Sequence, residues 1–357
     1  MQPSSPMEAP GTTEADARRN FRDQAGYCRE LGSPFIAELC DLLGSRLDHS
    51  SRFGRRVLGW PGNARADALA LRAAGAFNAL ARSEQVPALQ EVYPPRHGDR
   101  EALWHALART IASHDAFLHD YLDSAPQTNE VRRSSALLGG GLIIAREFGL
   151  PLSLLEIGAS AGLNLGFEHY RYELGTTAYG QAGSGVVIRS EWRGGAPELA
   201  TPLAVVARRA CDLNPLDAAS DRDRQRVLSY IWPDQSARVE TTEAAFDFAA
   251  GMPWRVERAD AAAWVEACLA EPAEAGLTRV LMHSIMWQYM PETTKERIAG
   301  AMQKAGEAAS LERPLAWLRM EADGGKEGAA VTLTTWPDGT EREIARADFH
   351  GRWVAWS

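Results

Sequence analysis

The feature that most constrains this chain is the stretch 152–164, which reads LSLLEIGASAGLN. Its apolar beginning is interrupted only by Ser153 and Glu156, stops at Gly158, and is followed by small residues as far as Gly162. This pattern predicts a buried parallel strand, a tight turn and then a helix. Small side chains let backbone N–H groups approach a ligand closely, and a helix N-terminus adds a positive field there.

The spacing of the small residues distinguishes three possible functions of this turn. A dinucleotide fingerprint requires G-x-G-x-x-G, and it fits poorly because the second and third positions are Ser160 and Leu163. A nucleophile elbow requires G-x-S-x-G, which GASAG matches literally with Ser160 at its centre. A loop that binds S-adenosylmethionine requires an acid followed by G-x-G-x-G or a small-residue version, and residues 156–162 match that pattern too. The loop alone does not choose between the last two.

Composition narrows the class of protein. The 357 residues carry a net charge of −9 without a run of Lys or Arg, so the sequence lacks the electrostatic footprint of a nucleic-acid-binding protein. The four cysteines never form C-x-x-C, which predicts buried or free thiols instead of a disulfide framework or a zinc site. No apolar run is long enough to cross a bilayer, and the N-terminus has no apolar signal core. We therefore expect a cytoplasmic protein with no membrane or nucleic-acid partner.

The order of patterns predicts three segments. Residues 1–14 are polar and rich in proline, which indicates a disordered lead-in. Residues 15–149 show apolar residues at helical spacing, with Ser33 and Pro34 as one helix start, and predict a helical domain. Three glycines, 139–141, fall inside the last of these helices, and close packing against a sheet is the expected reason. Residues 150–357 predict an α/β domain with an insertion at about 166–200.

Acidic residues follow two further apolar segments of the α/β domain. The second predicted strand, 203–207, leads to Asp212, where a carboxylate can accept hydrogen bonds from both hydroxyls of a ribose. The third predicted strand, 254–260, ends at Asp260, where an acid could accept from an adenine amino group. Asp260 is equally well placed to cap the helix that follows it.

A fourth predicted strand, 279–282, is followed directly by HSIMWQYMP. In an open α/β sheet ligands bind at the carboxyl ends of the strands, which places His283 and its neighbours near the chemistry. A fifth strand is predicted at 315–320. The segments 329–336 and 352–356 predict a terminal β pair that closes the sheet.

This order favours one meaning of the glycine loop. In an α/β-hydrolase the elbow serine follows several strands, whereas the region before Ser160 is helical by pattern. A triad order Ser160, Asp338, His350 can be written, although spacing alone does not bring those residues together. In a methyltransferase that uses S-adenosylmethionine, the glycine loop follows the first strand, acids end the second and third strands, and a β-hairpin ends the sheet. The chain has these features in that sequence.

Several motifs together also resemble a bacterial family of uncharacterised proteins: QTNE at 127–130, LLEIGASAGLNL at 154–165, DLNPLD at 212–217, WPDQ at 232–235 and HSIMWQYMP at 283–291. The resemblance extends from about Pro34 to the C-terminus. That family is regarded as having a methyltransferase-like fold. The resemblance therefore implies a class I methyltransferase-like (Rossmann-like), mostly parallel sheet preceded by a helical domain, and it implies no substrate.

The resulting hypothesis is an S-adenosylmethionine-dependent methyltransferase acting on a small molecule. His283 is the candidate base, with Tyr289 as a second catalytic candidate. The residues expected to bind the cofactor are Glu156, Gly158, Ala159, Ser160, Gly162, Asn164, Asp212 and Asp260. The residues expected to line the substrate pocket are Gln127, Asn129, Glu130, Ser284, Trp287 and Gln288. No metal is expected. The alternatives are a serine hydrolase using Ser160 and a non-catalytic protein that binds a nucleotide-like ligand, and the sequence leaves the methyl acceptor and the oligomeric state open.

Overall fold

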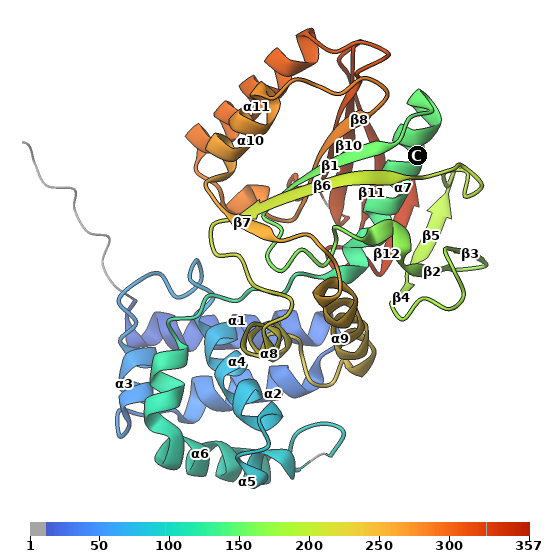
Figure 1. Ribbon diagram of the computed structural model, residues 1–357. Coiled ribbons are helices and arrows are strands. Elements are labelled where there is room, and N and C mark those ends of the chain that lie inside the picture. The colour runs from blue at the N-terminus through green and yellow to red at the C-terminus, as the bar shows by residue number, and fades with distance from the viewer. Residues whose placement is uncertain (1–11, 97, 326) are drawn as a thin grey trace, which may run out of the picture. The chain divides into compact units, whose positions relative to one another are not determined.

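The computed structural model describes residues 12–96, 98–325 and 327–357 (Figure 1). Its contacts divide the chain into two compact units. A helical unit contains residues up to Thr128 together with the later segment 225–240, and a sheet unit contains residues 129–224 and 241–357. Each unit has an apolar core of its own.

The helical unit is built on amphipathic helices that share one apolar core. Leu39, Leu43, Phe53 and Phe77 are fully buried in that core, and Trp232 from the later segment joins them. The helices of this part are α1 (Glu14–Glu30), α2 (Pro34–Arg46), α3 (Arg52–Leu58), α4 (Leu69–Arg82), α5 (Pro87–Gln90) and α6 (Arg100–Tyr121). Helix α8 (Asp221–Ser229) ends in this unit and α9 (Ser236–Ala250) begins in it. The predicted helical character of the N-terminal region is confirmed.

The helix starts follow local capping chemistry. The Ser33 hydroxyl accepts from the N–H of Ile36, and Pro34 occupies the first helical position, so the predicted start of α2 is confirmed. Thr13 caps α1 in the same way, by accepting from the N–H of Asp16. The helix therefore begins inside the predicted lead-in, whose residues 1–11 lie outside the described part of the chain.

The sheet unit contains, in the described residues, a nine-stranded mixed sheet in the order β5-β12-β11-β10-β9-β8-β1-β6-β7. Its parallel part, β9-β8-β1-β6-β7, has the 3-2-1-4-5 order of doubly wound folds when read from β7. The strands of this part are β1 (Leu152–Ile157), β6 (Val205–Asp212), β7 (Val256–Arg258), β8 (Thr278–Ser284) and β9 (Leu315–Glu321). The prediction of an α/β fold with a mostly parallel central sheet is confirmed at this level.

Helices cover both faces of the sheet. Helix α7 (Ser134–Phe148) packs against β9, β10 and β11, whereas α10 (Ala261–Ala270) and α11 (Glu292–Glu307) pack against each other and against β6 and β9 respectively (Figure 1). A Cβ on Gly139 would lie 2.0 Å from the Trp356 ring, and one on Gly140 would lie 2.4 Å from Leu318. The expectation that these glycines allow close packing against the sheet is therefore confirmed. Because α7 packs on the sheet, the division between the units falls at 128, not at the predicted 149.

The C-terminal strands correct the prediction of a terminal β pair. β10 (Ala329–Trp336) and β12 (Trp353–Trp356) do not pair with each other, because β11 (Thr340–Ala347) lies between them and is antiparallel to both. Half of the residues of β11, TEREIARA, are charged, so its apolar periodicity is too weak to reveal a strand. The sheet ends in an antiparallel set of strands instead of one hairpin.

The insertion after the first strand forms a small three-stranded sheet in the order β3-β2-β4. Its strands are β2 (Arg171–Leu174), β3 (Thr177–Tyr179) and β4 (Val187–Arg189), and β5 (Glu191–Gly194) then pairs with β12 in the large sheet. Tyr170 and Tyr172 are fully buried, and both hydroxyls donate to backbone carbonyls. These tyrosines are packing residues.

Two further features concern the predicted class of protein. The four cysteines are free and buried, as predicted. Among the described residues, no helix is both long and apolar enough to span a membrane.

Candidate functional site

The strand order places a crossover at the adjacent strands β1 and β8. The chain leaves β1 toward β6 on one side, and β8 continues toward β9 on the other. Ligands of open α/β sheets bind at such a crossover, beyond the carboxyl ends of the strands. Two segments lie at this edge. One is the glycine loop, 158–164, after β1, and the other is the HSIMWQYMP segment, which begins with the last two residues of β8.

The glycine loop has an unusual backbone. Gly158 and Gly162 have φ of 67° and 71°, and Ser160 has φ of 56°. Glycine adopts such angles at no steric cost, whereas a serine there is uncommon. Alternation of left-handed residues curls the loop, and Ser160 is 5% exposed within it, with a hydroxyl that has no hydrogen-bond partner in the described chain.

Two polar side chains from distant segments hold this loop. The Asp212 carboxylate, at the end of β6, accepts from the N–H of Ser160 at 2.9 Å. The Asn129 side-chain oxygen accepts from the N–H groups of Ala161 and Leu163 at 3.1 and 3.2 Å. Asn129 is thus a clamp on the loop. One of these residues precedes the loop in the sequence and the other follows it, and together they fix the conformation of the loop.

The predicted helix after the glycine loop is absent, and this expectation was wrong. Turns occupy the residues after 158, followed only by the short 3₁₀ helix η2 (Phe167–His169). The positive φ of Ser160 and Gly162 prevents α-helical propagation. The N–H groups of Ala159 and Gly162 are also used internally, by the carbonyls of Cys211 and Ala159. The loop therefore lacks both a helix dipole and the cradle of free N–H groups that a phosphate requires.

Glu156 lies beneath the loop in β1 and is 3% exposed. Its Oε2 has no hydrogen-bond partner in the described chain. Burial raises the pKa of Glu156 to about 8, and the negative charge of Asp212 adds to that rise. At neutral pH Glu156 is therefore mostly protonated and uncharged.

A second network holds the segment after β8. His283 is 1% exposed, and its Nδ1 lies 2.7 Å from a Glu321 carboxylate oxygen. The Trp317 indole N–H donates to Nε2 of His283 at 3.1 Å. Because an indole nitrogen only donates, Nε2 carries the lone pair and Nδ1 carries the proton. Glu321 also accepts from the backbone N–H groups of Met286 and Trp287 at 3.1 and 3.2 Å.

This network decides what His283 can do chemically in this arrangement. Both ring nitrogens are engaged by protein groups, and the Trp287 ring stacks on the imidazole with centroids 5.0 Å apart and planes within 11°. No lone pair of His283 is directed at a substrate here. Its contacts are those of a residue that fixes the segment.

The two segments touch each other at the crossover. A Cβ added to Gly158 would lie 2.8 to 3.0 Å from atoms of the Met286 side chain, so this methionine packs directly on the glycine. The backbone turns sharply beside it, because Ile285 has φ of 49°. The absence of a side chain at position 158 therefore makes room for the neighbouring segment.

The remaining predicted pocket residues are distributed along this edge. The Ser284 carbonyl accepts from Arg133 at 3.5 Å, and Trp287 is half-buried. Gln288 is exposed, and Tyr289 is 76% exposed, both in the short helix η3 (Trp287–Tyr289). Tyr289 thus presents its ring to solvent.

Residues near the QTNE motif have structural contacts. Glu130 caps the short helix η1 (Val131–Arg133) by accepting from the Arg132 N–H at 3.2 Å. The Asn164 amide donates to the Glu130 carbonyl at 3.4 Å, and its own oxygen is buried without a partner in the described chain. Gln127 belongs to the helical unit, and its role as a pocket residue stays a prediction.

Asp260 has the capping contact that sequence reasoning offered as one of its two roles. Its Oδ1 accepts from the Ala263 N–H at 3.0 Å at the start of α10, and it lies 3.8 Å from Arg297. The adenine contact stays a prediction.

The triad written for the hydrolase alternative does not assemble. Asp338 precedes β11 and His350 follows it, so they lie at opposite ends of a strand of eight residues. At about 3.3 Å per residue such a strand is far longer than a hydrogen bond. The Asp338 carboxylate accepts from the hydroxyl and the N–H of Thr340.

Sequence reasoning missed Glu321 and Trp317. Glu321 ends β9 just as Asp212 ends β6, so the rule that strand-end acids mark this edge could have selected it. Trp317 carries no comparable signal, because a tryptophan within a buried strand is most simply a packing residue.

Comparison with known proteins adds a family. The model of a family described as an uncharacterized protein conserved in bacteria (DUF2332) matches residues 18–356. The chain belongs to this family. The match includes both the glycine loop and the segment after β8, so the two networks lie within the family region. No curated protein and no solved structure matches the chain.

Proposed function

We propose that the sheet unit binds S-adenosylmethionine at the carboxyl ends of β1 and β8 and transfers its methyl group to a small-molecule acceptor, in a class I methyltransferase-like fold. The observation that carries the proposal is the 3-2-1-4-5 strand order with a glycine loop after the first strand and Asp212 after the second. This is where a nucleoside would meet an acidic group able to accept from its ribose hydroxyls. One Asp212 oxygen is used by Ser160 and the other by Asn214, and a carboxylate still has lone pairs for further donors.

The electrostatics of the loop favour this cofactor over a phosphate-bearing one. Internal use of the loop N–H groups and the missing helix argue against a pyrophosphate. S-adenosylmethionine carries a cationic sulfonium and no phosphate, so it needs no anion cradle. The acids at this edge, Asp212 and Glu321, suit a cation.

The residues of the chain would act mainly by positioning. When bound, the cofactor supplies an electrophilic methyl group to an attacking lone pair of the acceptor. Asn129 and Asp212 hold the glycine loop, and Glu321 with His283 holds the facing segment. Orientation of two reactants can contribute about 7–11 kcal/mol. We assign His283 a positioning role in place of the base role expected from its sequence position.

A thermal-shift titration with S-adenosylmethionine and S-adenosylhomocysteine tests the cofactor. A ligand at about 100 times its Kd stabilises by about 2.7 kcal/mol, and we expect a rise of a few degrees in the wild type. The rise should vanish in Gly158→Arg and Asp212→Ala, and persist in Asp217→Ala, which alters an exposed acid of the same DLNPLD run. ATP serves as the phosphate-bearing comparison and should give none.

The outcomes separate the alternatives. No rise at millimolar S-adenosylmethionine would overturn the proposal. A rise without methyl transfer to a broad panel of acceptors would favour the non-catalytic binding protein.

A further inference from the structure

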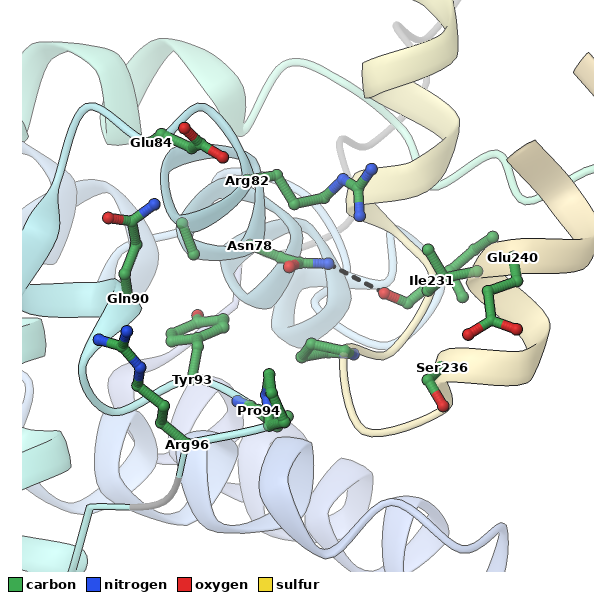
Figure 2. A pocket seen from close by; sticks show the side chains of 14 residues that line it. Asn78, Arg82, Glu84, Gln90, Tyr93, Pro94, Arg96, Ile231, Ser236 and Glu240 are labelled. Atoms are coloured by element: carbon green, nitrogen blue, oxygen red, sulfur yellow. Dashed lines mark hydrogen bonds between the residues drawn. The ribbon is translucent and has the colours of Figure 1, made fainter. Parts of the chain in front are cut away.

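The helical unit contains a cavity of about 620 Å³ that the proposed function does not use (Figure 2). All its lining residues belong to that unit, from α4 and the turn after it at Glu84, the segment 90–96 and the segment 231–240. This volume falls within the range of small-molecule sites. The cavity is therefore a candidate site in its own right.

The WPDQ motif forms one wall and is fixed by several hydrogen bonds. Asp234 accepts from the Ser33 hydroxyl at 2.6 Å and from the Phe35 N–H at 3.0 Å, which ties the motif to the start of α2. The buried Asn78 amide on α4 donates to the carbonyls of Ser229 and Ile231, both at 2.9 Å. These bonds give the wall a defined position before any ligand arrives.

The polar groups on the rim carry both signs of charge. Figure 2 shows Arg96 and Gln90 on one side of the cavity and Glu240 and Ser236 on the other. Within the described residues neither Arg96 nor Glu240 has an ion-pair partner, whereas Arg46, Arg56 and Arg224 do. Glu84 and Arg82 also line the cavity, so its rim carries charges of both signs, which fits a molecule with a carboxylate at one end and an ammonium at the other.

The lining between these charges suits a peptide. The Tyr93 ring and Pro94 supply apolar surface. The adjacent amide of Gln90 can hydrogen-bond a peptide group.

We propose that this cavity binds a short free peptide as a zwitterion, with its carboxylate at Arg96 and its ammonium at Glu240. The site is independent of the proposed methyltransferase function, and its ligand is distinct from the cofactor. Binding is expected to depend on both charged ends of the peptide.

Saturation-transfer NMR on the full chain tests the proposal with tri-alanine, N-acetyl-tri-alanine and tri-alanine amide as probes. Tri-alanine should bind best. Glu240→Gln should weaken tri-alanine by about three- to tenfold and leave the acetylated probe unchanged, and Arg96→Gln should do the same with respect to the amide probe. Arg109→Gln and Glu30→Gln, which alter exposed charges of the same unit away from the cavity, serve as controls.

Equal binding of all three probes, or no binding of tri-alanine at millimolar concentration, would overturn the proposal. Free alanine distinguishes a single amino acid from a peptide, and binding as tight as that of tri-alanine would contradict the peptide assignment. S-adenosylmethionine binding is measured separately, so failure of one site leaves the other intact.

Discussion

Two glutamates at the carboxyl edge of the sheet show how differently one side chain can be used. Glu156 lies beneath the glycine loop with an oxygen that has no partner in the described chain, and its pKa is raised to about 8. Glu321 lies beneath the facing segment and accepts from His283 and from two backbone N–H groups. The two acids lie near segments that touch each other at Gly158 and Met286.

The difference between these acids means that the two segments are held by different means. Asp212 and Asn129 hold the glycine loop through hydrogen bonds to its backbone, while Oε2 of Glu156 has no partner in the described chain. Glu321 holds the segment after β8 by accepting from the N–H groups of Met286 and Trp287. Pairs of acids in contrasting environments often divide their tasks.

Replacing Glu156 with Gln should change stability more than any other substitution at this edge. Since the folded-state pKa of Glu156 is raised from 4.5 to about 8, the unfolded chain loses its proton first, and wild-type stability falls as pH rises through that window. The slope is about 1.4 kcal/mol per pH unit, up to about 5 kcal/mol in total. Gln does not titrate, so the free energy of unfolding of Glu156→Gln should rise relative to that of the wild type from pH 4.5 to 8, and the difference should then level off. Urea unfolding at several pH values measures it.

Glu198→Gln is the control for that experiment, because Glu198 is exposed. Its stability difference from the wild type should stay nearly flat over the same range. A Glu156→Gln difference that is equally flat would mean that the two glutamates at the sheet edge do not differ as described.

Replacing Glu321 with Ala tests the network that holds the segment after β8. The change leaves a buried His283 nitrogen and two backbone N–H groups without their acceptor, which costs about 3 kcal/mol. Glu321→Gln keeps one acceptor oxygen and should recover part of the loss. Denaturant unfolding measures the stability. Equal stability of Glu321→Ala and the wild type would contradict the network.

The sequence predicted one of these two networks much better than the other. The loop and Asp212 have local signals, namely small residues after an apolar run and an acid at a strand end. Asn129 and Glu321 contact their partners across more than 30 residues of sequence, and no local pattern in the sequence indicates such a contact. The helix expected after Gly162 failed for a related reason, since Ser160 adopts a positive φ that its residue type does not announce. The strand β11 was not predicted, because the charged residues in it weaken its apolar periodicity.

Replacing Gly158 with Ala tests the contact between the two segments. The new Cβ would meet Met286 at 2.8 to 3.0 Å, and the φ of 67° is unfavourable for alanine, so a loss of about 2 kcal/mol is expected. Met286→Ala removes the collision, and the double variant should recover the steric part of that loss. A double-mutant cycle measures the coupling. Purely additive effects would show that the strain comes from φ alone.

The smallest effect is expected for Ser160→Ala, and it separates the glycine loop from a nucleophile elbow. The Ser160 hydroxyl is buried without a partner in the described chain, so its removal should change the unfolding free energy by no more than about 0.5 kcal/mol. A fluorophosphonate probe should not label the wild-type chain, because an unactivated serine is a weak nucleophile. The His283 nitrogen that could have activated a serine accepts from Trp317 instead. Labelling that disappears in Ser160→Ala would restore the hydrolase alternative, and it would require a base that the resting arrangement of this edge does not offer.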